Sequence, residues 1–282
     1  MISKVINRFT CNESQISSIL KKLKSRNMYP ILDYINENGD NHHKNYLKIK
    51  KNIINYPNNH FSIKLSSLNI HNDYNLAKQY AEEICEIAIE NDSNILIDAE
   101  DYKVQACINT ISNELMYKYN INKTNIYKTY QCYRKDSFNT IKDDLYDKDI
   151  KGYNLGVKLV RGAYYNQDAQ YNILYENINL THNNYNKCVE YLFNSIHEND
   201  RLMIATHNKE TCELAIQKLH LLKNENVLSF AQLMGMGDNL SNFLSSNYRI
   251  YKYVPFGSFY ESCPYLLRRL YENKDSIKYL LK

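Results

Sequence analysis

Eight short apolar or β-branched runs recur along this chain, and a longer stretch with helical periodicity follows each of them. The expected strands span residues 29–35, 60–68, 94–100, 125–133, 155–162, 201–208, 227–233 and 249–256. Helical periodicity is clearest in residues 13–27, 45–54, 73–91, 101–119, 185–196, 209–223 and 239–246. Because strands alternate with helices, the sequence predicts an α/β fold built on a parallel sheet.

The number of these units favours one parallel architecture over another. Roughly eight strand–helix units is what a (β/α)8 TIM-type barrel requires. An open doubly wound sheet is the rival, but it normally carries a glycine-rich turn, and no GxGxxG segment follows any expected strand. No linker interrupts the series. We therefore expect one barrel domain over residues 1–282, with a leading helical segment at 1–27 and the barrel at 28–282.

Composition argues against several classes of protein. The 35 basic and 31 acidic residues are interspersed, so no basic block marks a nucleic-acid-binding surface. The seven cysteines are scattered without a CxxC pair, which indicates neither a disulfide framework nor a zinc site. No apolar run approaches the roughly 20 residues of a membrane span, and the N-terminus does not resemble a signal or transit peptide. A soluble or membrane-peripheral protein in a reducing compartment is expected.

Polar residues gather where the expected strands end, which is where the working residues of such barrels lie. They are Asp33, Glu37, Lys64, Ser66, Asp98, Glu100, Gln131, Lys158, Arg161, Thr206, His207, Asn208, Gln232 and Tyr253. Any one of them could belong to an ordinary buried ion pair, but together on one face they indicate a site. The set suits a polyanionic cofactor and a carboxylate substrate, and it implies no metal.

A second candidate feature is the segment CPYLLRRLYEN at residues 263–273, which has the pattern of a helix. Its adjacent arginines point about 100° apart, so they can serve one anion that sits between them. Tyr265 and Glu272 each lie one turn from an arginine, on the same side as Arg268 and Arg269. The alternative is a surface helix with solvated arginines.

Seven segments together resemble the motif series of the proline dehydrogenase family, in the family's order. They are IDAED, TYQCY, GVKLVRGAYY, MIATHN, FAQLMGMGD, YKYVPFG and PYLLRRLYEN. The resemblance runs from about Arg8 to the C-terminus and lacks the longer eukaryotic N-terminal extensions, so a minimal catalytic barrel is expected. It implies a distorted barrel that holds FAD without a covalent link, with the last helix over the barrel mouth.

The resemblance also assigns roles to particular residues. It implies that Arg268 and Arg269 clamp the carboxylate of L-proline, and that an arginine of the last helix pairs with Glu37 as a gate. Lys158 would lie beside flavin N5 with Asp98 orienting it, while Lys64 and Asp98 are the nearest candidates for a base. The other pocket residues would be Tyr253, Tyr265, Glu272, Leu233, Ala163 and Tyr164. Gln131 and Lys158 would lie near the isoalloxazine, and the other cofactor contacts would be Arg161, Gly162, Thr206 and His207.

The implied reaction is hydride transfer from proline C5 to FAD, which gives Δ1-pyrroline-5-carboxylate. Electrons would then pass to a quinone or another acceptor, with the protein in peripheral contact with a membrane. A cytoplasmic or membrane-peripheral location is expected, and a mitochondrial one is compatible. The resemblance also implies that Tyr253 favours proline over 4-hydroxyproline, because relatives specialised for 4-hydroxyproline tend to lose this ring, which crowds the position of the extra hydroxyl. Asp168 and His182 depart from the family pattern, and both are expected in loops or caps, near a helix that Thr181 caps.

Two other functions remain compatible with the sequence. A lysine at a strand end is also typical of Schiff-base aldolase-type barrels, and Lys64 or Lys158 could serve there. A non-catalytic protein that senses proline or flavin would keep the same pocket. A flavin spectrum and borohydride trapping with a carbonyl substrate distinguish the three.

Overall fold

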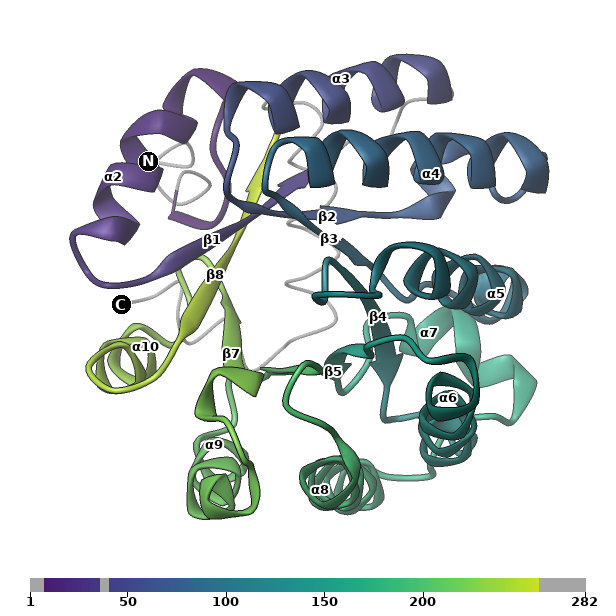
Figure 1. Cartoon of the computed structure of the whole chain (residues 1–282), viewed down its shortest axis with the longest axis vertical. Helices are drawn as coiled ribbons and strands as arrows, with labels where there is room; N and C mark the ends of the chain where they lie inside the picture. The colour runs from purple at the N-terminus through teal and green to yellow at the C-terminus, as the bar shows by residue number, and fades with distance from the viewer. Residues whose placement is uncertain (1–7, 36–40, 259–282) are drawn as a thin grey trace.

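Eight parallel strands pair in chain order, and the last pairs with the first, so the sheet closes into a barrel (Figure 1). This computed structural model describes residues 8–35 and 41–258. The strands are β1 Tyr29–Tyr34, β2 His60–Ile63, β3 Asn94–Ile97, β4 Ile126–Gln131, β5 Gly156–Val160, β6 Arg201–Ala205, β7 Leu228–Leu233 and β8 Ile250–Phe256. Each lies within an expected strand, which confirms the predicted barrel.

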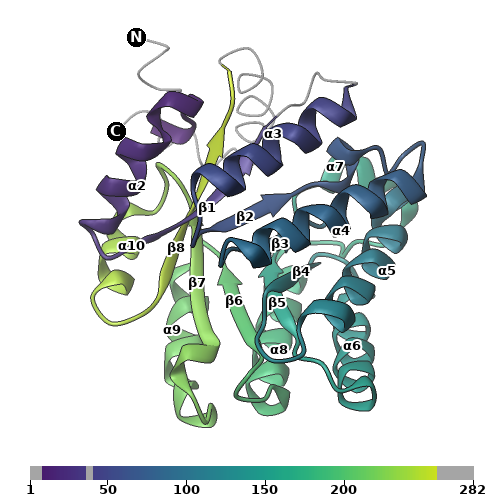
Figure 2. The same ribbon diagram turned by 45° about the horizontal axis from the view of Figure 1, so that its top comes forward.

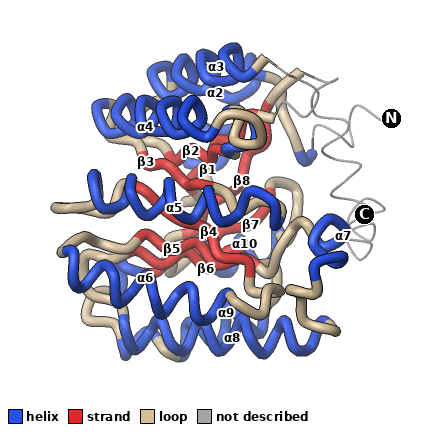
Figure 3. Tube along the Cα trace, turned by 90° about the vertical axis from the view of Figure 1, so that its right-hand side faces the viewer, coloured by secondary structure: helices blue, strands red, loops and turns tan. Residues whose placement is uncertain are grey.

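Helices cover the outside of the barrel (Figures 2 and 3). They are α2 Ile16–Lys24, α3 His42–Asn55, α4 Tyr74–Glu90, α5 Tyr102–Tyr119, α6 Ser137–Lys151, α7 Tyr165–Asp168, α8 Ile178–Ser195, α9 Lys209–Gln217 and α10 Asp238–Ser245. Short 3₁₀ turns are η1 Glu13–Gln15, η2 Leu65–Leu68, η3 Ala169–Tyr171, η4 Leu219–Leu221 and η5 Glu225–Val227. The predicted leading helix is confirmed as η1 and α2. The expected last helix lies outside the described residues.

Two local predictions about helices need correction. The stretches of clearest helical periodicity omit α6, because Ile141 and Leu145 are the only aliphatic side chains that this mostly polar helix buries in the described structure. Thr181 does not cap α8; the helix begins earlier, where the Asn177 side chain accepts from the Leu180 N–H at 3.0 Å. His182 therefore lies inside α8 and not in a loop.

The strands bury both faces, as the strands of a parallel barrel must. Ile31 belongs to the cluster that fills the barrel interior, with Leu96 and Met203, whereas its neighbour Leu32 packs into the layer between strands and helices. This alternation follows from the two-residue period of a strand. In the part of the chain that the structure describes, no helix is long and apolar enough to cross a membrane.

A buried charge on the outside of β4 is fully paired. Lys128, 2% exposed, donates to Asp144 Oδ2 at 2.6 Å and to Asn113 Oδ1 at 2.9 Å. The Tyr130 hydroxyl donates to the same Asp144 oxygen at 2.7 Å. Asp144 thus joins α6 to the barrel wall, and this pairing is what permits a lysine in a buried strand.

We expect Asp144→Ala to reduce the free energy of unfolding by about 3–5 kcal/mol, because it leaves the Lys128 ammonium buried without its carboxylate. Urea denaturation at neutral pH measures this loss. Asp147→Ala on the same helix is the control: Asp147 pairs with Lys151 at the surface at 2.9 Å, and its removal should cost less than about 1 kcal/mol. Equal losses in the two variants would contradict a special role for the buried pair.

Candidate active site

The carboxyl ends of the strands surround a pocket of about 210 Å³. Asp33 of β1, Lys158 of β5 and Tyr253 of β8 line it, together with Lys64 after β2 and Asp98 after β3. The other predicted site residues that line this pocket are Arg161, Gly162, Ala163, Thr206, His207, Gln232 and Leu233. The structure thus brings together residues from strands that are distant in the sequence.

Ten predicted residues are not placed in this pocket, and three of them are the strand-end residues Ser66, Glu100 and Asn208, which do not line it. Tyr164 is buried at the start of α7 and does not line it. Gln131 does not line it either. The predictions for Glu37, Tyr265, Arg268, Arg269 and Glu272 fall outside the described residues.

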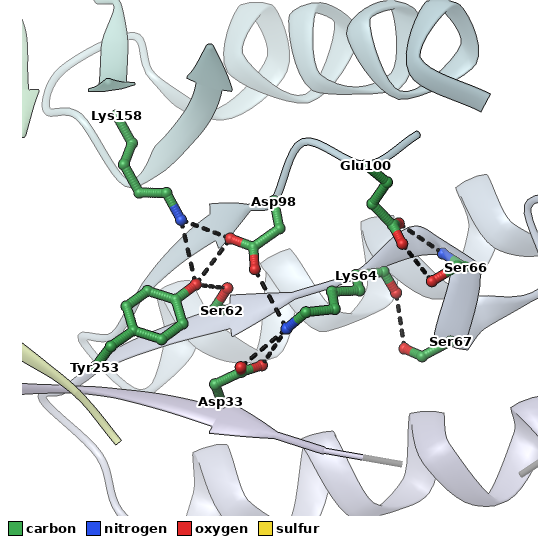
Figure 4. A network of polar contacts seen from close by, with 9 residues as sticks. All are labelled: Asp33, Ser62, Lys64, Ser66, Ser67, Asp98, Glu100, Lys158 and Tyr253. Atoms are coloured by element: carbon green, nitrogen blue, oxygen red, sulfur yellow. Dashed lines mark hydrogen bonds and ion pairs between the residues drawn. The ribbon is translucent and has the colours of Figure 1, made fainter. Parts of the chain in front are cut away.

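Asp98 is the centre of a charged network (Figure 4). Its Oδ1 accepts from Lys158 Nζ at 2.6 Å and from the Tyr253 hydroxyl at 2.8 Å, and its Oδ2 lies 3.3 Å from Lys64 Nζ. Lys64 lies between Asp98 and Asp33, and it donates to both Asp33 oxygens at 2.7 and 2.9 Å. Two ammonium groups and two carboxylates therefore balance one another in this network.

The two carboxylates of the network differ in proton affinity. Burial opposes ionisation of Asp98, but the Lys158 and Lys64 ammonium groups outweigh it and hold the pKa of Asp98 well below its usual range. Burial raises the pKa of Asp33, because Lys64 offsets only part of that cost and the Asp98 charge adds to it. Burial, then Asp98 and Asp33, raise the pKa of Tyr253, so its hydroxyl stays protonated.

Buried polar groups brace the loops around the network. Glu100, 2% exposed, accepts from the Ser66 N–H at 2.8 Å and from the Ser66 hydroxyl. The Gln131 amide donates to the Glu100 carbonyl at 2.8 Å, and its oxygen accepts from the Ala163 N–H at 3.1 Å. In the described structure Gln131 therefore links the loops after β3 and β5.

Arg161 presents a positive charge at the pocket wall. Its Nε donates to His182 Nδ1 at 2.7 Å, Nη1 donates to Thr206 Oγ1 at 2.7 Å and Nη2 donates to Thr211 Oγ1 at 3.0 Å. The guanidinium lies 4.5 Å from the centre of the Tyr185 ring. These partners are uncharged acceptors and an aromatic ring, so they orient the cation without neutralising it, which suits an anionic ligand.

His207 carries a buried donor that lacks a partner among the described residues. Its Nε2 accepts from the Leu233 N–H at 3.2 Å, so the neutral ring holds its proton on Nδ1. Nδ1 is buried and makes no hydrogen bond there. A side chain at position 237, where glycine has φ +64°, would place Cβ 2.9 Å from this nitrogen. A ligand group that accepts from Nδ1 would satisfy it.

Gly162 is required by close packing against Tyr133. Its φ is +139°, and an added Cβ would lie 1.3 Å from a ring carbon of Tyr133. The Tyr133 hydroxyl donates to Asp168 Oδ2 at 2.7 Å, and the Tyr102 N–H donates to Oδ1 at 2.8 Å. Asp168 is fully buried at the end of α7, as the prediction of a loop or cap position allows.

Sequence reasoning missed Ser62 and Lys252. The Tyr253 hydroxyl gives its one proton to Asp98, so the neighbouring Ser62 hydroxyl donates to the tyrosine oxygen. Lys252, 2% exposed, donates to the Met236 carbonyl at 2.7 Å and to the Leu233 carbonyl at 3.4 Å, so it holds the loop after β7. Burial lowers the pKa of Lys252 to about 8, although Asp238 opposes the shift. A lysine in a buried strand is the signal that could have identified it.

Comparisons with known proteins agree on one family. A family model described as Proline dehydrogenase matches residues 8–280. Proline dehydrogenase 1, mitochondrial, of Caenorhabditis elegans is 33% identical over 211 residues, which cover 70% of this chain and 34% of that protein. The human protein of the same name is 34% identical over 213 residues, which cover 71% of this chain and 36% of the relative. This chain thus spans about a third of the length of these relatives.

Solved structures show the same fold. Proline utilization A from Bdellovibrio bacteriovorus, inactivated by N-propargylglycine, superposes with a TM-score of 0.84 at 22% identity. The alignment covers 96% of this chain and 33% of that chain. Within residues 8–35 and 41–258, no group of three or more His, Cys, Asp or Glu side chains is placed to hold a metal ion.

We expect the free energy of unfolding to fall less steeply at acid pH in His207→Gln than in the wild type. Burial, with Lys252 next, lowers the pKa of His207 to about 4 in the folded protein, whereas an unfolded histidine titrates near about 6.5. The unfolded chain therefore binds the proton first, and stability falls as pH drops from the unfolded value to the folded one. The histidine's share of this loss is up to about 3 kcal/mol.

Urea denaturation at several pH values between neutrality and the folded pKa measures this effect. His220→Gln, at an exposed position, is the control and should keep the wild-type slope. A wild-type slope in His207→Gln would show that the buried ring does not resist protonation.

Proposed function

This chain belongs to the proline dehydrogenase family, and from that premise we propose that it oxidises L-proline to Δ1-pyrroline-5-carboxylate with FAD. The observation that carries the proposal is the network in which Asp98 holds Lys158 and Lys64 inside the pocket. This network fixes two ammonium groups at the end of the barrel where such enzymes work. The relatives' names support proline as the substrate.

The pocket residues fit a flavin dinucleotide. When bound, FAD supplies the acceptor for the hydride at flavin N5. Arg161 and Thr206 offer a cation and a hydroxyl for its phosphates or ribose, and the Nδ1–H of His207 offers the buried donor that needs an acceptor. Lys158 would hold the isoalloxazine from within the pocket, and we place Gln131 and Gly162 near it on the family resemblance alone.

Lys158 stabilises the charge that arrives with the hydride. Lys158 is 4% exposed, and its ammonium is fixed by Asp98 at 2.6 Å and lies 3.2 Å from the Tyr253 hydroxyl. Because these partners hold the cation in place before the reaction, it does not have to reorganise during hydride transfer. Asp98 therefore orients the catalytic cation.

The remaining described residues shape the place of the substrate. Leu233 and Ala163 supply an apolar wall for the pyrrolidine ring, and Tyr253 lines the pocket from its position on β8. We assign Tyr164 to the wall by resemblance. Outside the described residues, we propose that Arg268 and Arg269 clamp the carboxylate, with Tyr265 and Glu272 beside them and Glu37 as a gate. Such clamping would aim C5 at the flavin.

Electrons would leave the reduced enzyme for a quinone or another acceptor. We propose a membrane-peripheral location for this step, in mitochondria or at a cytoplasmic membrane face. The word "mitochondrial" in the relatives' names supports the former.

A Schiff-base aldolase fits the geometry less well. That chemistry needs a lysine whose amine is available as a nucleophile. Lys64 donates to Asp33 at 2.7 Å and Lys158 to Asp98 at 2.6 Å, so both amines are engaged in ion pairs. A non-catalytic sensor would share the pocket, and turnover distinguishes it from an enzyme.

We expect FAD-loaded protein to lose its visible flavin absorbance when anaerobic L-proline is added. Lys158→Met should slow this bleaching about 100- to 1,000-fold, because it removes the fixed cation. Lys158→Arg should restore part of the rate. Stopped-flow absorbance gives the rate constants, and flavin fluorescence confirms that each variant binds FAD. Protein that takes up no FAD, or a lysine trapped by borohydride with a carbonyl substrate, would overturn the proposal.

We expect Tyr253→Ser to raise the kcat/KM ratio of 4-hydroxyproline to proline by about tenfold, since a lost ring contact in a pocket typically changes discrimination by this order. Tyr253→Phe is the matched control, because it keeps the ring but loses the hydroxyl that donates to Asp98. Phenylalanine should slow both substrates without changing their ratio. A changed ratio in Tyr253→Phe would assign selectivity to the hydroxyl instead.

A further inference from the structure

Oxidation of proline must release a proton as well as a hydride. Proline carries a secondary ammonium group at neutral pH. When a C5–H bond breaks, its electron pair leaves with the hydride, and the nitrogen must form a double bond to C5. One N–H bond breaks so that its electrons can form that bond, and the freed proton needs an acceptor. This requirement holds only if the proposed function is correct.

Asp33 is placed to serve as that acceptor. It lies at the end of β1, lines the pocket and is 1% exposed. Both of its oxygens accept from Lys64 Nζ, at 2.7 and 2.9 Å. The same ammonium lies 3.3 Å from Asp98, so Lys64 connects the two carboxylates (Figure 4). A proton that reaches Lys64 therefore has a direct path to Asp33.

The two carboxylates on Lys64 are not equivalent. Asp98 also accepts from Lys158 at 2.6 Å and from the Tyr253 hydroxyl at 2.8 Å, and these donors favour its ionised form. The charged or titratable groups that act on Asp33 among the described residues are Lys64, Asp98, Lys158 and Tyr253. Two neighbouring acids whose environments separate their proton affinities have different roles.

We propose that Asp33 takes up the proton that leaves the proline nitrogen, with Lys64 as the relay. Lys64 passes one N–H proton to a carboxylate oxygen of Asp33 and receives one from the substrate nitrogen. Lys64 ends the step with the charge that it had, and Asp33 becomes a neutral acid. Asp98 stays ionised, so it keeps Lys158 in place throughout.

Proton release gives a test that is independent of turnover rate. FAD-loaded wild-type protein is mixed anaerobically with L-proline in weak buffer with a pH-indicator dye, and dye and flavin absorbance are followed together. We expect the proton to appear in solution after the flavin has bleached, because Asp33 retains it. In Asp33→Asn we expect the two signals to coincide.

The pH profile gives a second readout. The rate constant for wild-type bleaching should fall at low pH as Asp33 becomes protonated in advance. Asp33→Asn should not show this fall in rate at low pH, and near neutral pH it should react at least about 100-fold more slowly than the wild type. Its rate should increase with buffer concentration, since a solvent base must then take the proton. Asp33→Glu should restore part of the wild-type rate.

Asp200→Asn is the matched control. Asp200 is likewise 1% exposed and lies 3.0 Å from a lysine, Lys148, but it precedes β6 at the opposite end of the barrel. It should lower stability without changing the pH profile or the order of the two signals. Bleaching with simultaneous proton release in the wild type would overturn the role of Asp33, even if Asp33→Asn does not fold. Wild-type protein that binds FAD but is not bleached by L-proline would instead overturn the proposed function.

Discussion

The attraction between one carboxylate, Asp98, and two lysines determines the arrangement of the whole pocket. Lys64 arrives from the end of β2 and Lys158 from within β5, and Asp98 follows β3. A charged lysine is costly to bury unless a counter-charge meets it, so neither lysine could occupy the barrel end alone. The counter-charge keeps both cations in the site and also fixes their positions. Stability and chemistry are thus linked at the same atoms.

The barrel interior is aromatic and apolar toward the amino ends of the strands and charged at their carboxyl ends, and this difference in polarity supports the network. At the amino ends of the strands, His60 and Tyr251 pack with ring centroids 4.4 Å apart, and burial, with Arg249 next, lowers the pKa of His60 to about 3. Ile31, Leu96 and Met203 belong to the interior cluster. These apolar residues exclude water from the barrel interior beneath the pocket. Charges at the carboxyl ends of the strands therefore act in a medium of low polarity.

Much of this arrangement follows from the sequence, and the exceptions have physical causes. All eight strands were predictable because buried strands are short, apolar and bounded by polar residues. The polar strand ends were predictable because all strands of a parallel barrel end at one face. Ser62 was not, because its partner Tyr253 is far away in the chain. Lys252 was overlooked, although a lysine within a buried strand could have identified it. The beginning of α8 was misjudged since Asn177, and not Thr181, satisfies its first N–H groups.

The pairing of β1 with β8 is the seam that closes the barrel, and the pocket can form only after this pairing. The pairing of β1 with β8 runs from Tyr29 with Tyr251 to Tyr34 with Phe256, so it joins segments near opposite ends of the chain. Asp33 and Tyr253 sit on the two sides of this seam. During synthesis β1 must wait until β8 has left the ribosome before the two can pair, and contacts of such long sequence separation form slowly. A nascent chain therefore cannot assemble this pocket from its first strands, because the wall that β8 supplies has not yet been made.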